Sequence, residues 1–194
     1  MRKIIMFNRV SADGYFADAA GELSWTVPDD ELDQSAAAGI DETDAMLFGR
    51  KTYDLFESYW PHATSEDPHA AGRHNDSIRR MAEWINRSAK YVFSETRRSL
   101  PWQNSHLLGK FTPEQVLSLK QQPGKSIMLF GSGTIVSLLS RHRLIDEYRL
   151  VVSPLLLGVG QSLLRGIPLD LPLRLVDVKR YGSGNITLSY EPAT

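Results

Sequence analysis

The sequence contains no cysteine among its 194 residues. Without cysteine a chain cannot form disulfides, bind zinc through thiolates or use a thiol nucleophile, and such a composition is typical of the reducing cytoplasm. The chain also lacks an excess of charge of either sign, with 22 Lys and Arg against 23 Asp and Glu. Because nucleic-acid binding needs clustered basic residues to neutralise phosphates, this balance argues against a nucleic-acid partner.

Long hydrophobic runs are missing as well. The first apolar run stops at Phe7, which is too short for the core of a signal peptide or for a membrane span. The five histidines show no pairing at metal-ligand spacing, so we expect no metal site. The remaining composition, 42% apolar and 23% charged, is that of an ordinary globular protein, and we expect a single domain over residues 1–194.

Short apolar runs alternate with longer mixed segments along the chain. Runs bounded by turn residues predict strands, and those without polar alternation predict strands covered on both faces. The strand candidates are Lys3–Val10, Ala45–Phe48, Tyr91–Phe93, Ser126–Phe130 and Tyr148–Val152. The helix candidates are Asp29–Ala38, Thr52–Tyr59, Asp76–Asn86, a helix that starts at Thr112-Pro113, and Thr134–Arg141. This alternation predicts an α/β fold.

The end of the chain has a different pattern. Arg174–Arg180 and Asn185–Glu191 alternate like strands around a turn at Tyr181–Gly184. Such a pair predicts an antiparallel hairpin, so the sheet should be mixed. The segment Pro61–Asn75 has no periodicity, and we interpret it as a surface loop.

Two predicted strands end in turns that are suited to phosphate binding. The first leads into Gly49-Arg50-Lys51-Thr52 and the second into Gly131-Ser132-Gly133-Thr134. Free N–H groups at a helix start, with cations or hydroxyls nearby, bind phosphate. An ordinary strand-to-helix turn also explains either pattern alone, and the second lacks the third glycine of G-x-G-x-x-G. Two such turns together favour a ligand beyond the carboxyl ends of the strands.

These turns resemble those of the dihydrofolate reductase superfamily, and the likeness is closer to the reductase domain of bacterial riboflavin biosynthesis. The motifs that carry it are, in chain order, Ser11–Tyr15, Gly49–Tyr53, Val92–Ser94, Phe130–Thr134, Leu144–Glu147 and Val152–Gly160. The colinear similarity runs from about Met1 to Tyr190. It implies a three-layer fold with a mixed, mostly parallel central sheet, flanking helices and a C-terminal antiparallel hairpin.

The resemblance implies an NAD(P)H-dependent reductase that transfers a hydride to a pteridine-like or aminopyrimidine-like ring, as 5-amino-6-(5-phosphoribosylamino)uracil reductases do. By position, the residues that would hold the cofactor, NADPH or NADH, are Gly49, Arg50, Lys51, Thr52, Ser94, Gly131, Ser132, Gly133 and Thr134. Ser94 would lie near the adenosine 2′-phosphate. Glu95 follows it, and its carboxylate repels a 2′-phosphate unless Arg97 or Arg98 compensates.

The resemblance also implies which residues lie at the reacting end. Asp13 is the first candidate for catalysis and Asp30 the second, while Tyr15, Trp25 and Asp29 are candidates for substrate binding. Acidic residues at a helix start are also expected from the helix dipole, and a tryptophan near a helix is as often a packing residue. The alternatives to this reductase are a nucleotide-binding protein without turnover and a true dihydrofolate reductase.

A homodimer is the expected assembly. The resemblance implies contact through the C-terminal region, which carries an excess of leucines at Leu155–Leu157, Leu163–Leu164, Leu169, Leu171 and Leu173. Apolar surface of this kind often marks an interface. The alternative explanation is that the same leucines cover the sheet within one chain.

Overall fold

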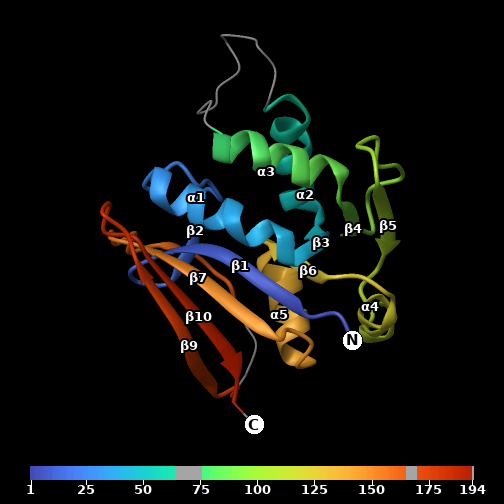
Figure 1. Ribbon diagram of the computed structural model, residues 1–194. Helices are drawn as coiled ribbons and strands as arrows, with labels where there is room; N and C mark the ends of the chain where they lie inside the picture. Colours follow the sequence, from blue (N-terminus) through green and yellow to red (C-terminus); the bar gives the residue numbers. More distant parts are fainter. Residues whose placement is uncertain (64–75, 165–169, 194) are drawn as a thin grey trace.

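The computed structural model describes residues 1–63, 76–164 and 170–193. Its main sheet has the strand order β5-β4-β3-β6-β1-β7-β10-β9 (Figure 1). The six strands from β5 to β7 run parallel, and β10 runs antiparallel to both of its neighbours. The strands are β1 (Ile4–Ser11), β3 (Thr43–Gly49), β4 (Ala89–Phe93), β5 (Ser105–Gly109), β6 (Ser126–Phe130), β7 (Glu147–Ser153), β9 (Leu173–Arg180) and β10 (Ile186–Pro192). The predicted mixed, mostly parallel sheet with its C-terminal hairpin is therefore confirmed.

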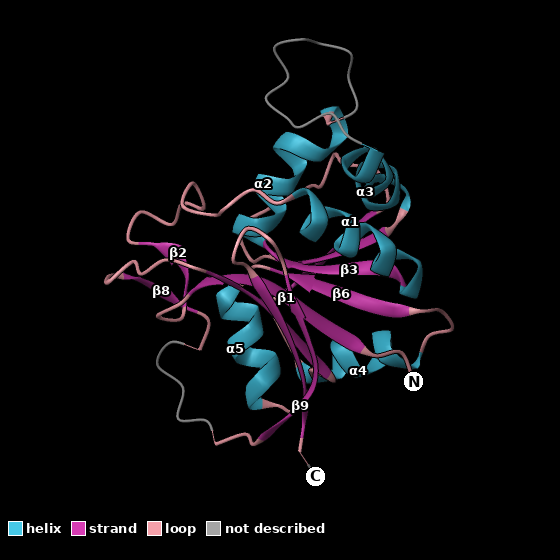
Figure 2. Ribbon diagram, turned by 60° about the vertical axis from the view of Figure 1, so that its left-hand side comes forward, coloured by secondary structure: helices cyan, strands magenta, loops and turns pink. Residues whose placement is uncertain are grey.

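Helices cover both faces of this sheet (Figure 2). One face carries α1 (Asp30–Ala38), α2 (Arg50–Tyr59) and α3 (Asp76–Arg87), and the other carries α4 (Pro113–Gln121) and α5 (Gly133–Arg141). Short 3-10 helices follow α1 at Gly39–Glu42 and α2 at Trp60–His62. The predicted three-layer arrangement is confirmed. None of the helices within the described ranges has the length and hydropathy needed to cross a membrane.

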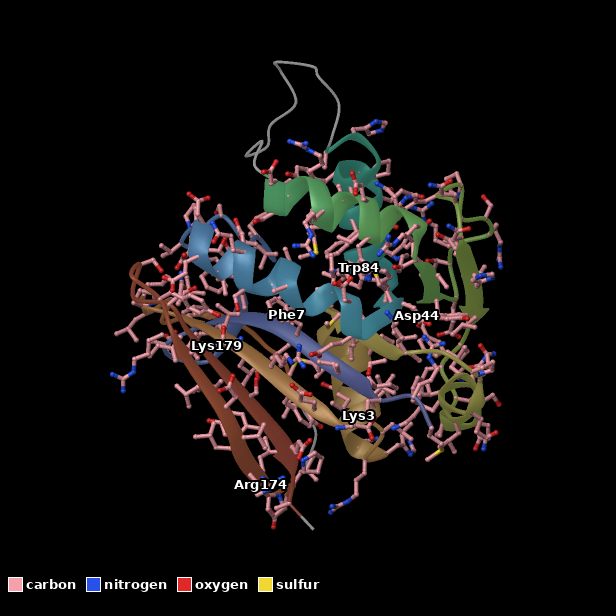
Figure 3. The ribbon with its side chains drawn as sticks, viewed as in Figure 1. Lys3, Phe7, Asp44, Trp84, Arg174 and Lys179 are labelled. Carbon is pink, nitrogen blue, oxygen red and sulfur yellow. The ribbon has the colours of Figure 1, made fainter. Side chains whose placement is uncertain are left out.

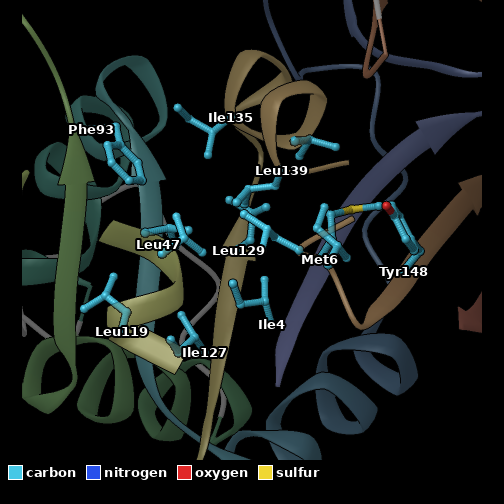
Figure 4. Packing of buried hydrophobic residues seen from close by; sticks show 14 of the residues in the cluster. Ile4, Met6, Leu47, Phe93, Leu119, Ile127, Leu129, Ile135, Leu139 and Tyr148 are labelled. Atoms are coloured by element: carbon cyan, nitrogen blue, oxygen red, sulfur yellow. The ribbon is translucent and has the colours of Figure 1, made fainter. Parts of the chain in front are cut away.

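Two hydrophobic clusters join these layers. Alternate residues of the central strands point to opposite faces, so that Ile4 and Met6 of β1 pack toward α4 and α5 while Ile5 packs toward α2 and α3. Figure 4 shows the first cluster, with Leu129 and Ile127 of β6 beside β1. Full burial of one such side chain contributes about 1.5–3 kcal/mol. The continuous apolar runs that predicted central strands are explained by burial on both faces.

Local signals set the starts of α1 and α4. The Asp29 carboxylate accepts a hydrogen bond of 3.0 Å from Leu32 N at the start of α1. At α4, Thr112 Oγ1 accepts from Gln115 N and the Gln115 side chain accepts from Thr112 N, with Pro113 at the first helical position. The helix predicted to begin at Thr112-Pro113 is confirmed.

Three strands escaped prediction. β5 is a half-exposed edge strand with little apolar sequence, while β2 (Tyr15–Asp18) and β8 (Gly160–Ser162) form a separate short ribbon. Tyr15, a candidate for substrate binding, is the first residue of β2 and follows the turn that ends at Gly14.

The predicted loop Pro61–Asn75 is wrong at its beginning. Pro61 and His62 belong to the 3-10 helix that ends at His62, where Pro61 occupies an early helical position that needs no backbone N–H. The part of this prediction that covers residues 64–75, including His69 and His74, lies outside the described residues.

Candidate functional site

The strand order brings the predicted turns to one edge of the sheet. β4, β3, β6 and β1 are consecutive neighbours and parallel, so their carboxyl ends lie side by side. Ser94 follows β4, Gly49 ends β3, Gly131 follows β6 and Ser11 ends β1. Residues spread over 120 positions of the sequence thus share the edge at which α/β sheets bind ligands.

Two hydroxyl groups tie the two central turns together. Ser132 Oγ accepts a hydrogen bond of 2.8 Å from Gly49 N, and Thr52 Oγ1 accepts one of 2.9 Å from Ser132 N. Each turn therefore supplies a side chain that satisfies a backbone N–H of the other. This reciprocal bridge holds the starts of α2 and α5 at a defined separation.

Neither of these two helix starts is capped by a side chain of the described residues. α1 and α4 in the same chain do have side-chain caps, on Asp29 and Thr112. The first N–H groups of a helix have no intrahelical acceptor, and the helix dipole makes that end positive. Two uncapped starts held side by side are suited to a ligand with two linked phosphates.

The glycines of the second turn leave room that any side chain would fill. Gly131 has a φ of +52°, and a Cβ placed there would lie 2.8 Å from Thr52 Oγ1. A Cβ on Gly133 would lie 2.9 Å from the ring of Phe16. Ser132 between them also has a positive φ, of 57°, which is uncommon for a residue with a side chain. The missing side chains thus let Thr52 and Phe16 pack closely against this turn, and a pyrophosphate fits the backbone donors that it presents.

Gly49 has a different purpose from the one that the sequence indicates. A Cβ on Gly49 would lie 3.1 Å from Ile135 Cγ1 of α5, so the missing side chain lets α5 pack against the end of β3. Lys51 is exposed at the start of α2, and Ser94 is buried after β4. Ser94 Oγ accepts hydrogen bonds from the backbone N–H groups of Thr96 and Arg97 at 3.3 and 3.0 Å.

Asp13 serves as an anchor for a neighbouring segment. Its carboxylate accepts hydrogen bonds from Ser11 Oγ at 2.5 Å, Leu157 N at 3.1 Å and Gly158 N at 2.7 Å. The Ser11 hydroxyl and the two backbone donors lower the pKa of Asp13, against a smaller opposing effect of desolvation. A carboxylate held in this way stays ionised, so it orders the chain beside the site and is poorly suited to donate a proton.

The other candidates at this end, Asp29, Asp30 and Trp25, differ in burial and in hydrogen bonding. Asp29 is the buried cap of α1 and accepts a hydrogen bond from Ser183 in the hairpin turn. Burial raises the pKa of Asp29, but hydrogen bonds from Ser183, Leu32 N and Asn185 outweigh it and the net shift is downward. Asp30 is exposed, and the indole of half-buried Trp25 donates to Glu22 O at 3.0 Å.

A groove of about 470 Å³ lies beneath α1, and its lining runs from Phe130 at the carboxyl end of β6 to Glu42 and Glu147 at the amino ends of β3 and β7. Its floor includes Phe7 of β1 and Phe130 of β6, whose ring centroids are 6.0 Å apart, and Trp84 of α3. Figure 3 shows Phe7 and Trp84 on the α1 side of the sheet, with Lys179 on the hairpin nearby. Phe130 directly precedes Gly131, so an aromatic surface adjoins the phosphate-binding turn. Tyr15, Trp25 and Asp29 are not among the residues that line the groove.

Sequence patterns alone missed Asp33, a carboxylate of α1 that lies beside β1 and does not itself line the groove. Asp33 Oδ1 of α1 lies 3.6 Å from Arg9 Nη2 on β1, and the Asp33 side chain is 19% exposed. Arg9 is two residues beyond Phe7 and so on the same face of β1. Burial raises the pKa of Asp33, Arg9 lowers it and Asp29 raises it further. The signal in the sequence was the helical spacing from Asp29, which places Asp33 one turn further along α1.

Fold and site together define an α/β protein of the dihydrofolate reductase-like class, in which a mixed sheet presents two glycine-containing turns at one edge. Residues 2–187 match the family described as the RibD C-terminal domain. The chain therefore belongs to this family. It is 30% identical over 193 residues to the uncharacterized protein YyaP of Bacillus subtilis (strain 168), with 97% of this chain and 94% of that protein aligned.

Solved structures share the fold at low sequence identity. A putative riboflavin biosynthesis protein from Shewanella sp. PV-4 matches with a TM-score of 0.74 and 21% identity over 99% of both chains. A diaminohydroxyphosphoribosylaminopyrimidine deaminase/5-amino-6-(5-phosphoribosylamino)uracil reductase from Thermotoga maritima matches with a TM-score of 0.65 and 17% identity, over 99% of this chain and 57% of that one. Dihydrofolate reductase from Enterococcus faecalis, complexed with NADP(H) and RAB-propyl, matches with a TM-score of 0.64 and 10% identity over 99% and 97%.

Proposed function

We propose that this protein is an NAD(P)H-dependent reductase that transfers a hydride to a pteridine-like or aminopyrimidine-like ring, of the kind found in 5-amino-6-(5-phosphoribosylamino)uracil. The observation that carries the proposal is the pair of uncapped helix starts, α2 and α5, joined by the bridge between Ser132 and Thr52. Family membership and the reductases among the structural neighbours support it.

The chain's own groups suit a nicotinamide dinucleotide. The pyrophosphate would lie on the backbone of Gly131–Thr134 and the start of α2, with Arg50 and Lys51 as cations beside it. The nicotinamide, when bound, supplies the hydride. Because the turns sit between β4 and β1, the adenosine would extend toward Ser94 on one side and the nicotinamide toward Phe7 and the groove on the other.

The reacting ring of the substrate would lie on the aromatic floor formed by Phe7 and Phe130. Asp33 is the proposed proton donor, because it is the carboxylate near this floor whose pKa burial raises. Asp13 would order the segment around Gly158 beside the nicotinamide. Asp30 as a second acid, and Tyr15, Trp25 and Asp29 as substrate contacts, stay predictions.

Titration with NADPH and NADH tests the cofactor assignment. We expect saturable quenching of tryptophan fluorescence, and Arg50→Ala should weaken the binding about tenfold because a phosphate loses a cation. Arg79→Ala is the matched control, since Arg79 also pairs with an aspartate on a helix surface but lies in α3. Absence of binding of either nucleotide at millimolar concentration would exclude the reductase function. Binding without oxidation of the cofactor by a panel of pteridines and aminouracils would indicate a nucleotide-binding protein without turnover.

We also propose that two copies associate through the C-terminal hairpin. All eight residues of the edge strand β9 are exposed, and Leu173, Leu175 and Val178 have exposed side chains. Leu175 pairs with Tyr190, which packs on the α5 side, so Leu175 lies on that face of the sheet. An uncovered apolar edge strand of this kind invites pairing with another copy.

Light scattering after gel filtration should give twice the mass of one chain at micromolar concentration. Leu175→Lys should shift the protein to monomer because it places a charge in the apolar face, whereas Asp177→Lys, on the opposite face of β9, should not. A wild-type protein that is monomeric at these concentrations would contradict the dimer.

A further inference from the structure

One aspartate at the edge of the candidate site holds two arginines. Asp54 Oδ2 accepts a hydrogen bond of 2.8 Å from Arg50 Nη1, and Asp54 Oδ1 accepts from Arg97 Nη2 at 2.8 Å and from Arg97 Nε at 3.1 Å. Both oxygens of the carboxylate are therefore engaged. The guanidinium groups of Arg50, at the start of α2, and of Arg97, in the turn that Ser94 holds, therefore both have a counter-ion.

This cluster is built into the fold. The turn after β4, which Ser94 fixes through Arg97 N, sends the Arg97 side chain back over the ring of buried Tyr53, with the guanidinium carbon 5.5 Å from the ring centroid. Arg97 Nη2 also donates to Glu57 Oε2 at 2.5 Å. Arg97, Asp54 and Glu57 are each less than 35% exposed as side chains, so solvent screens them less than a fully exposed pair.

The cluster around Arg97 contains more carboxylate oxygens than there are hydrogen-bond donors to them. Glu57 Oε1 is buried and has no hydrogen-bond partner among the described residues. Arg97 is thus matched by two carboxylates, and one carboxylate oxygen is left over to accept a hydrogen bond. The hydrogen bonds to Asp54 and Glu57 also raise the pKa of Arg97, which means that they favour its charged form.

NADPH and NADH need different groups from such a cluster. A 2′-phosphate on the adenosine ribose needs an arginine that is available, whereas an unmodified ribose donates its 2′-hydroxyl to a carboxylate. A phosphate at this edge would meet the charges of Asp54 and Glu57 and would have to compete with them for Arg50 and Arg97. A ribose hydroxyl is uncharged, so it leaves the ion pairs of Arg50 and Arg97 intact.

We infer that Asp54 sets the dinucleotide selectivity of this protein by occupying the two arginines that a 2′-phosphate would need, so that NADPH is bound with little or no preference over NADH. This inference rests on the proposed function, since it requires a dinucleotide whose adenosine lies beside Ser94. It assigns a specificity-determining part to a residue that lies outside the predicted motifs and contacts one of them through Arg50.

The test compares dissociation constants for NADPH and NADH in the wild type and in Asp54→Asn. The wild type should bind the two within tenfold of each other. Asp54→Asn should tighten NADPH about tenfold and change NADH less than twofold, because removal of one negative charge releases Arg50 and leaves Arg97 paired with Glu57 alone, without altering the side chain's shape. The gain for NADPH should shrink in 0.5 M salt, as expected for partly exposed charges, for which the Debye length falls to a few ångströms at about this concentration.

Two further variants keep the outcome unambiguous. Asp76→Asn removes an aspartate that pairs with Arg79 on the surface of α3 and should leave both constants unchanged. Glu57→Gln removes one of the two carboxylates that hold Arg97 and should shift the ratio in the same direction by a smaller factor; it replaces Asp54→Asn if that variant fails to fold.

A wild-type preference for NADPH of tenfold or more, or a ratio that changes less than threefold in Asp54→Asn, would overturn the inference while leaving the reductase proposal intact. Failure of the wild type to bind either nucleotide would overturn both, and the two failures are therefore distinguishable.

Discussion

Replacing Gly131 by alanine is expected to weaken NADPH binding about 100-fold, the scale of loss that a misplacement of about 1 Å produces in a positioned site. The new Cβ would lie 2.8 Å from Thr52 Oγ1 and 2.9 Å from Thr52 Cγ2. Thr52 is β-branched and sits on a helix, so its side chain has little freedom to move aside. Any shift of Thr52 would break the hydrogen bond from Ser132 N that holds the two turns together.

The backbone conformation adds to this effect. Gly131 has a φ of +52°, a region that costs a residue with a side chain about 1–2 kcal/mol. Urea unfolding should therefore show a loss of about 2 kcal/mol in the free energy of unfolding, with the protein still folded without denaturant. Gly182→Ala is the matched control, because a Cβ at Gly182 has no neighbour within 4 Å and its φ is not positive. NADPH affinity that is equal in Gly131→Ala and wild type would show that this turn does not hold the cofactor.

Replacing Asp33 by asparagine is expected to lower the turnover number about 100-fold, the usual contribution of a positioned general acid. Asparagine preserves the shape of the side chain and cannot donate the proton that an acid supplies. Dissociation constants for the cofactor should stay within about threefold, because Asp33 belongs to α1 and the cofactor turns belong to α2 and α5. Asp30→Asn, on the exposed side of the same helix, is the comparison variant because Asp30 is the other predicted acid on α1, and activity retained there but lost in Asp33→Asn would assign the proton to Asp33.

The pH dependence gives a second readout for Asp33. Burial raises its pKa above the ordinary 3.8, so the protonated form persists to higher pH than it does for a free aspartate. As pH rises through that raised pKa, the protonated fraction and with it the turnover number of the wild type should fall. The residual turnover of Asp33→Asn should lack this dependence. If Asp30→Asn loses as much activity as Asp33→Asn, or if both variants follow the wild-type pH profile, Asp33 is not the proton donor.

The sequence predicted the layered sheet because its signals are local. A buried strand such as Ser126–Phe130 needs only a run of apolar residues between turn residues, and its predicted bounds match β6. The capping residues Thr112 and Asp29 act within their own helices and were equally legible. Short or half-exposed strands such as β2 and β5 carry no such run, so they were missed.

Sequence patterns did not predict which polar groups are buried. Lys90 on β4 has no exposed surface, and its ammonium donates to the carbonyl oxygens of Asn86, Ser88 and Gln103 at 2.9–3.2 Å. Burial lowers the pKa of Lys90 to about 8. A lysine in a strand sequence normally indicates a solvent-facing position, and only the three carbonyls supplied by other segments make its burial tolerable.

By itself, the sequence determined which segments become strands and helices. It also determined that two of the strands lead into glycine-containing helix starts. Both follow from the sequence because hydrophobic periodicity, capping residues and turn residues act over a few positions. Only the tertiary structure decided that Ser132 bonds to Gly49 across 83 residues, that Asp54 holds Arg97 across 43, and that Asp33 faces Arg9. These contacts depend on the order in which parallel strands pair in the sheet. That order is set by the packing of both hydrophobic clusters at once, and no local pattern in the chain encodes it.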